Sequence, residues 1–180
     1  YLVSGSFDKT VRIWDRATRR TRRTLANHTH IVLAVAVSHD SQTLASAGLD
    51  KQVLVYDLPL TGSVATRNDL PAEPSALALA ADGTFLAAGD RNGNVRLYSA
   101  ETLEPGQELS GGTAATHAVA VRADGELVVA VQADSTLRSW QRADGAGQAT
   151  LTLSAPARDV VWHPDNTRLA VAGEDGQLRV

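Results

Sequence analysis

The chain has 180 residues and a formal net charge of −3 at pH 7, which excludes a polybasic or polyacidic binder in bulk. It has no cysteine, which excludes a disulfide framework, a thiolate nucleophile and a cysteine-based zinc site. The longest wholly apolar run, Ile31 to Val37, is too short to cross a bilayer and no signal peptide is seen, so no membrane association is expected. The compartment stays open, with the cytoplasm favoured.

In chain order, short strands follow one another. Residues 1–14 contain two strands, and residues 21–25 form a third, outer strand. Residues 33–38 (LAVAVS) alternate large and small side chains with the period of two expected of a strand. The next strands are predicted at residues 43–47 and 53–56, and later segments keep the same plan.

Three sets of landmarks repeat along the chain. Aromatic residues that end strand-like runs recur every 42 residues, at Trp14, Tyr56, Tyr98 and Trp140. One series of turn residues is Asp40, Asp82, Asp124 and Asp165, and the other is Asp8, Asp50, Asn92, Asp134 and Asp175. The residues after three of the first series, Gly83, Gly125 and Asn166, are expected to have positive φ.

A period of 40 to 45 residues that closes on an aromatic residue is typical of WD40 propeller blades, and the whole chain resembles a WD40-repeat protein. The resemblance implies an all-β, WD40-type β-propeller. Dividing 180 residues by 42 gives about 4.3 repeats, so we expect a partial propeller with three complete central blades and incomplete first and last blades. The expected repeats are 1–15 (partial), 16–57, 58–99, 100–141 and 142–180 (partial). Because there is no methionine, we expect the chain to be an excerpt of a larger propeller.

The resemblance also implies a hydrogen-bonded set in each blade: a His, a Ser or Thr, the turn Asp and the Trp. The first blade keeps Ser4, Asp8 and Trp14, and the second keeps His28, Ser46 and Asp50, with Tyr56 in place of Trp. At the same positions the third blade has Leu70, Ala88, Asn92 and Tyr98. The fourth blade has Gly112, Ala130, Asp134 and Trp140, and the fifth has Leu153, Val171 and Asp175. A Ser/His/Asp set could indicate a catalytic triad. The family positions and the absence of a nucleophile elbow favour a structural network, and we expect no enzyme activity.

Two patterns could indicate metal. Residues 90–94 match the first half of a calcium loop, but the later Gly and Glu are missing, and Asn92-Gly93 suits a type I′ turn. The five His residues include one i, i+2 pair, His28 and His30, without an evident third ligand. We therefore expect no metal and no cofactor.

The most basic stretch is a possible binding patch on the outer strand: Arg16, Arg19, Arg20, Arg22 and Arg23. Arginine suits phosphate, RNA or acidic proteins. No aromatic residue is interleaved for base stacking. This favours the interpretation that the charges protect an exposed strand edge from pairing with other chains.

The remaining candidates follow from the resemblance, because in the family the residue before the turn Asp points to the face where partners dock. The matching residues are Phe7, Leu49, Arg91, Ala133 and Glu174. The leading functional hypothesis is a non-enzymatic scaffold that binds proteins or peptides. The alternatives are nucleic-acid or phosphate binding through residues 16–23, and a regulatory propeller of a larger multidomain enzyme.

The two ends of the chain predict an incomplete ring. Residues 1–14 and 167–180 both carry second-strand and third-strand sequence, so they cannot complete each other. We expect an open arc touching five blades. The missing blades would come from the rest of the native chain or from a second copy.

Overall fold

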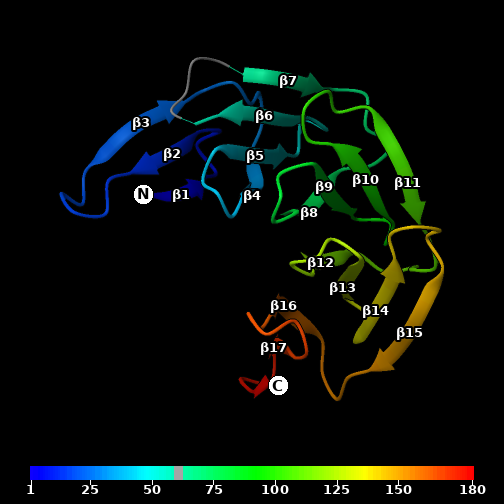
Figure 1. Ribbon diagram of the computed structural model, residues 1–180. Coiled ribbons are helices and arrows are strands. Elements are labelled where there is room, and N and C mark those ends of the chain that lie inside the picture. Colours follow the sequence, from blue (N-terminus) through cyan, green and yellow to red (C-terminus); the bar gives the residue numbers. More distant parts are fainter. Residues whose placement is uncertain (59–62) are drawn as a thin grey trace.

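The computed structural model describes residues 1–58 and 63–180 and consists of five antiparallel β-sheets (Figure 1). These residues contain no helix, and therefore none that could cross a membrane. The expected all-β class is confirmed.

Each sheet is built from strands that follow one another in the chain. The first sheet contains β1 (Leu2–Gly5), β2 (Val11–Trp14) and β3 (Thr21–Leu25). The second contains β4 (Val32–Val37), β5 (Thr43–Gly48), β6 (Val53–Asp57) and β7 (Ser63–Arg67). The third contains β8 (Pro74–Leu79), β9 (Phe85–Asp90), β10 (Val95–Ser99) and β11 (Pro105–Leu109). The fourth contains β12 (Thr116–Val121), β13 (Leu127–Gln132), β14 (Thr136–Gln141) and β15 (Gly147–Thr152). The fifth contains β16 (Ala157–Trp162), β17 (Leu169–Gly173) and β18 (Leu178–Arg179).

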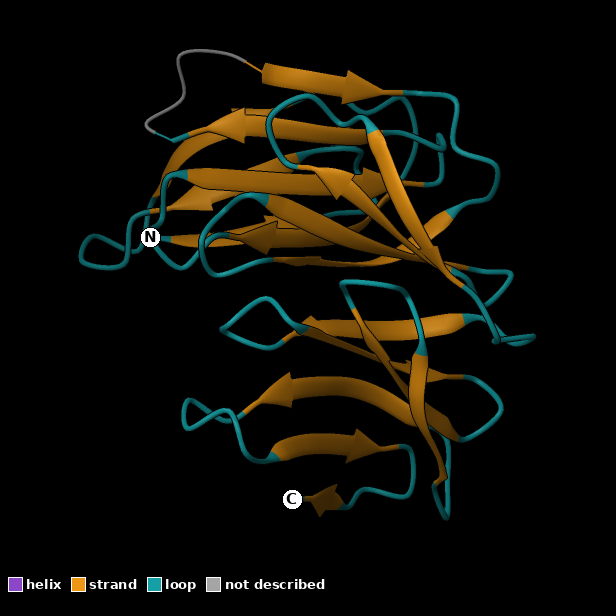
Figure 2. Ribbon diagram, turned by 45° about the vertical axis from the view of Figure 1, so that its right-hand side comes forward, coloured by secondary structure: helices purple, strands orange, loops and turns teal. Residues whose placement is uncertain are grey.

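The sheets stack face to face around an open arc, with the first and fifth sheets at its two ends (Figures 1 and 2). The inner strands make the contacts between sheets: β1 packs against β4, β4 against β8, β8 against β12, and β12 against β16. Three sheets have four strands and the two at the ends of the arc have three. The predicted partial propeller is therefore confirmed, whereas the boundaries of the individual repeats stay a prediction.

The strands lie within one residue of their predicted positions in the second repeat. The predicted strands at 33–38, 43–47 and 53–56 correspond to β4, β5 and β6. Turn chemistry explains this agreement, because each turn Asp accepts a backbone hydrogen bond from the residue two positions on. Asp82 accepts from the amide of Thr84 at 3.0 Å, and this bond is the main reason that the pKa of Asp82 is lowered.

Positive φ values mark the same turns in successive blades. Gly83, Gly125 and Asn166 have φ of 70°, 74° and 62°, which confirms the expectation for these residues. The type I′ turn expected at Asn92-Gly93 is wrong. Gly93 has φ of 92°, but Asn92 is not among the residues with positive φ, and a type I′ turn needs both.

Three of the four spaced aromatic residues are buried, each against the preceding sheet. Tyr56 lies in a hydrophobic cluster with β2, Tyr98 in one with β6, and Trp140 in one with β9 and β10. Trp14 is only partly buried. The reason is its position: Trp14 lies on the first sheet of the arc, so no preceding sheet covers it.

Candidate functional site

The second blade brings together His28 from the connection between β3 and β4, Ser46 on β5 and Asp50 in the turn after β5. Nδ1 of His28 lies 2.9 Å from Oδ2 of Asp50, and its Nε2 lies 2.8 Å from the hydroxyl of Ser46. With the ring proton on Nδ1, the imidazole donates to Asp50 and accepts from Ser46. The Asp50 carboxylate also accepts from the amides of Thr29 at 2.8 Å and Gln52 at 3.2 Å.

Burial and hydrogen bonding act in opposite directions on Asp50. Burial raises its pKa, but the hydrogen bonds from the Thr29 amide and the His28 ring outweigh burial and hold the pKa below its usual value. Ser46 is 0% exposed, so its hydroxyl cannot reach a substrate. The geometry of this set is that of a buried brace between strands, not of an accessible nucleophile.

The other blades carry only parts of this set. In the first blade, the Trp14 indole donates to the Ser4 hydroxyl at 2.9 Å, while Asp8 accepts from the amide of its own turn residue Thr10. In the third blade, Leu70, Ala88 and Tyr98 lie in one apolar cluster, with a void of about 20 Å³ beside them. In the fifth blade, the Leu153 and Val171 positions are likewise apolar, and Asp175 pairs with Arg179.

The fourth blade has a substitute network that sequence reasoning missed. Gln132 is 0% exposed, and its amide nitrogen donates to the carbonyl of Gly93 in the third blade at 2.7 Å. Its amide oxygen accepts from Nε of Arg138 at 2.8 Å and from the Thr136 hydroxyl at 3.2 Å. Gly112, which stands at the His position, makes room: a Cβ there would lie 1.9 Å from the Gln132 nitrogen. Two features of the sequence could have indicated this network. Gly112 stands where the family has His, and Gln132 stands 42 residues after Asp90, at the equivalent position of the next blade.

The residues that suggested metal make other contacts. The Asp90 carboxylate accepts from the amides of Asn92 and Asn94, both at 2.9 Å, so it caps its own turn. Nδ1 of His30 accepts from the Ile31 amide, away from the contacts of His28. Across residues 1–58 and 63–180, no group of three His, Asp or Glu side chains is arranged to hold a metal ion.

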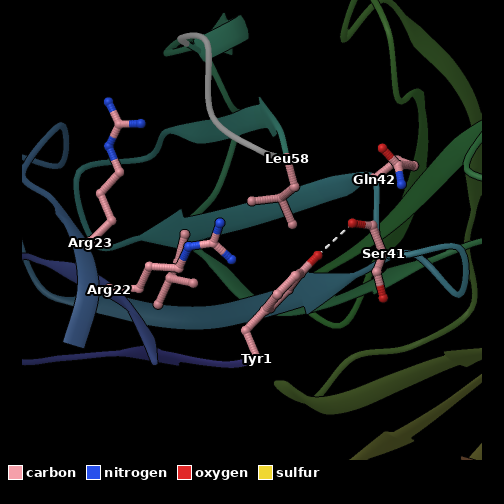
Figure 3. Close-up of a pocket in the computed structure, with 7 residues that line it drawn as sticks. Tyr1, Arg22, Arg23, Ser41, Gln42 and Leu58 are labelled. Carbon is pink, nitrogen blue, oxygen red and sulfur yellow. Dashed lines mark hydrogen bonds between the residues drawn. The ribbon is translucent and has the colours of Figure 1, made fainter. Parts of the chain in front are cut away.

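Two residues of the basic patch, Arg22 and Arg23, lie on the edge strand β3 of the first sheet, and Arg16, Arg19 and Arg20 lie in the turn before it. β3 pairs only with β2 in that sheet, and the five arginines at residues 16–23 are exposed. Arg22 and Arg23 line a cavity of about 480 Å³ with Tyr1, Leu58 and the turn at residues 41–42 (Figure 3). In this view Arg22 extends toward Tyr1, whose hydroxyl donates to the Ser41 carbonyl, while Arg23 points away. The structure thus places an aromatic residue beside the arginines, which the sequence order did not reveal.

The five predicted face residues occupy equivalent turns at one end of the sheets. The amides of four of them donate to the carbonyl just before the inner strand of the same sheet, namely Leu49 to Ile31, Arg91 to Glu73, Ala133 to Ala115 and Glu174 to Pro156. Phe7 lies on the corresponding turn of the first sheet and is 81% exposed. Leu49 is half-buried, so the apolar surface expected from this pair is carried mainly by Phe7.

Charged pairs occupy the equivalent turn positions of the third and fifth blades. Arg91 pairs with Glu73 at 3.2 Å and Glu174 pairs with Arg158 at 2.7 Å, all at least one-third exposed. Exposed pairs of this kind contribute little to stability, so their groups can exchange partners at low cost.

Comparisons with known proteins agree with this architecture. The family model described as "WD domain, G-beta repeat" matches residues 1–15, 19–57, 71–99 and 147–180. The unmatched residues 100–146 include Gly112 and Gln132, where the fourth blade departs from the usual set.

Relatives carry the same repeats. The chain is 25% identical to the WD repeat-containing protein SL1-17 of Schistosoma mansoni, covering 100% of this chain and 60% of that protein. It is 25% identical to autophagy-related protein 16 of Arabidopsis thaliana, covering 99% and 36%. It is 29% identical to the small ribosomal subunit protein RACK1y of Oryza sativa subsp. japonica, covering 82% and 46%. The chain therefore spans 60% or less of these relatives, and the repeat architecture together with the family match shows that it belongs to the WD40 family.

Proposed function

We propose that this chain is a non-catalytic interaction module that docks protein or peptide partners on the turn face defined by Phe7, Leu49, Arg91, Ala133 and Glu174. The observation that carries the proposal is the 81% exposure of Phe7 at the tip of a structured turn. An aromatic side chain held open to water on a rigid scaffold is a favoured anchor for a partner. The names of the relatives, which include a ribosomal subunit protein and an autophagy-related protein, are compatible with an interaction role.

The surroundings of Phe7 support a partner segment that combines an apolar residue with acidic ones. The turn that carries Phe7 is tied to the second blade, since the amide of Val32 donates to the Ser6 carbonyl at 3.1 Å. The exposed residues Lys9 and Lys51 follow the turn aspartates of the first two blades. The partner would bury its apolar residue against Phe7 and place carboxylates near the lysines.

The experiment is site-specific photo-crosslinking of the full-length protein in cells. A photoreactive residue replaces Phe7, and a matched one replaces Ser41, which is exposed at the opposite end of the sheets. We expect one discrete partner to crosslink at Phe7 and not at Ser41. Binding of that partner, once purified, should weaken about tenfold or more in Phe7→Ser, since an anchor residue typically contributes about 2 kcal/mol or more. Equal crosslinking from both positions, or unchanged affinity in Phe7→Ser, would contradict the proposal.

A second candidate function is binding of phosphate groups or nucleic acid at the basic patch. The observation that favours it is the cavity that Arg22, Arg23 and Tyr1 line, with Arg22 extending toward the Tyr1 ring (Figure 3), because a stacking ring and a guanidinium group suit such ligands. The test is a mobility-shift titration with single-stranded RNA at two salt concentrations. We expect weak, nonspecific binding with a steep salt dependence. Tight, saturable binding at physiological salt that is lost in Arg22→Ala and Arg23→Ala would make this the main function.

A third possibility stays open from the sequence, a regulatory propeller attached to the catalytic domain of a larger protein. The chain spans only part of its relatives, which supports a larger protein but not a catalytic domain in it. The proposed docking face would then act within one polypeptide, and crosslinks from Phe7 would be intramolecular.

A further inference from the structure

The outer strands of the first four sheets are equivalent edges with different protection. Each of β3, β7, β11 and β15 ends its sheet and leaves one side of its backbone without a strand partner. Such an edge is a template for pairing with another chain unless charge, proline or a bulge protects it. One position in each of these strands is equivalent, because its residues are 42 apart: Thr24, Thr66, Glu108 and Thr150. Their partners on the neighbouring strands are also 42 apart and are, in the same order, Arg12, Leu54, Arg96 and Arg138.

Three of the four edges carry a protecting feature. β3 has Arg22 and Arg23. β11 begins with Pro105, and its Glu108 pairs with Arg96. β7 ends in Arg67, whose guanidinium pairs with Asp69. Two copies of any of these strands would bring like charges together or lose a backbone donor.

β15 has none of these features. Its sequence GQATLT is uncharged, and no charged residue occurs from Gly145 to Ala157. All six residues of the strand are exposed, with Leu151 at 58%. β15 is therefore the least protected of the four edges.

The register shows which backbone groups of β15 face outward. The Leu153 amide donates to the Ser135 carbonyl at 2.7 Å, so this residue directs its backbone toward β14. In an antiparallel ladder, hydrogen-bonded and non-hydrogen-bonded residues alternate. Leu151, which pairs with Leu137, therefore also faces β14. The amide and carbonyl groups of Thr150 and Thr152 point away from the sheet.

We propose that β15 pairs edge to edge with β15 of a second copy of this chain, antiparallel, about a twofold axis at Leu151. In this register Thr150 of each copy lies opposite Thr152 of the other, so outward-facing donors and acceptors meet on both sides of the axis. The two Leu151 side chains become direct neighbours and lose exposed apolar surface. Thr–Thr pairs are favourable across strands, and no charge is brought near its like. The strand is thus complementary to itself.

The size of this contact sets its strength. A single pair of short strands buries less surface than the roughly 1,200–2,000 Å² of a standard stable interface. The association is therefore weak and depends on protein concentration. It also uses the rim of the propeller and leaves the turn face around Phe7 open.

The test measures association of the purified protein by sedimentation equilibrium from about 1 µM to about 1 mM. Thr150→Pro removes one outward amide and leaves the backbone hydrogen bonds to β14 in place, because proline is tolerated where an edge amide faces solvent. The Thr150 hydroxyl, which accepts from Arg138 on β14 at 3.3 Å, is lost in this variant and in the lysine variant alike. Thr150→Lys places a positive charge on the same edge. The matched controls are Thr24→Pro and Thr24→Lys, at the equivalent exposed position of β3. Circular dichroism checks that each variant is folded.

We expect wild-type dimers whose dissociation constant rises at least tenfold in both Thr150 variants and is unchanged in both Thr24 variants. Should Thr150→Pro fail to fold, Thr150→Lys decides alone. Amide exchange at Thr150 and Thr152 should slow as protein concentration rises. A wild-type protein that is monomeric at about 1 mM overturns the proposal, as does association that the Thr150 variants leave unchanged. Loss of a different polypeptide partner in the Thr150 variants of a monomeric protein would also overturn it, since the occupant would then not be a second copy.

Discussion

Replacing Asp50 by Ala should destabilise the protein more than the same change at any equivalent turn. The side chain is 3% exposed, and its partner His28 is 1% exposed. Removing the carboxylate leaves Nδ1 of His28 buried without an acceptor, which costs about 1–3 kcal/mol. The Thr29 and Gln52 amides also lose their acceptor, but both residues are partly exposed and can bond to water. The expected loss is therefore about 2–3 kcal/mol in total.

The matched control is Asp134→Ala, at the same turn of the fourth blade. Asp134 is 31% exposed and accepts from the amide and hydroxyl of Thr136, with no His in contact. Its loss should cost less than about 1 kcal/mol. For a chain of this length, the Asp50 variant should melt roughly 4–12 °C lower than wild type.

The assay is urea unfolding followed by circular dichroism, with a double-mutant cycle that adds His28→Ala. The cycle should give a coupling energy of about 1 kcal/mol or more between the two side chains. Equal destabilisation by Asp50→Ala and Asp134→Ala, or a coupling energy near zero, would refute the interpretation that the buried His28–Asp50 pair braces the second blade.

Three further predictions concern the same kind of network. Because the pKa of Asp50 is lowered in the folded state, the ionised side chain stabilises the protein above its ordinary pKa of 3.8, and this contribution is lost as pH falls through the folded value. In urea unfolding between about pH 2 and 6, Asp50→Asn should therefore lose less unfolding free energy on acidification than wild type. Gln132→Ala should lower the free energy of unfolding by about 2–3 kcal/mol, because the Gly93 carbonyl and the Arg138 guanidinium lose a buried partner; Gln148→Ala on exposed β15 is the control, and an equal effect of the two would disprove the network. Gly112→Ala should cost about 2 kcal/mol or more in thermal unfolding, since its Cβ would collide with Gln132, whereas Gly147→Ala has nothing within 4 Å and should stay within about 0.5 kcal/mol of wild type; a neutral Gly112→Ala would mean that both the Gln132 side chain and the Gly93 carbonyl, 2.3 Å from the added Cβ, can move aside.

Local features of the chain predicted its strands and turns. Strand alternation and turn residues act over two to six neighbours, and their 42-residue recurrence predicted the strands of each blade and the positive φ of Gly83 and Gly125. The resemblance to WD40 repeats then related these strands to radial sheets. The positions of His28, Ser46 and Asp50 followed from it, and the structure brings their side chains into contact.

Contacts between blades could be seen only in the tertiary structure, because they join residues that are far apart in the sequence and belong to no common local pattern. The burial of an aromatic residue depends on the sheet before it, which is why Tyr56 is fully buried and Trp14 only partly. The position of Tyr1 beside Arg22, at a cavity shared with the next sheet, depends on how two sheets pack. Gln132 can take over the role of the missing His only because Gly112, on another loop, leaves space for its side chain. The sequence pattern shows that the His is absent, but not which side chain occupies its place.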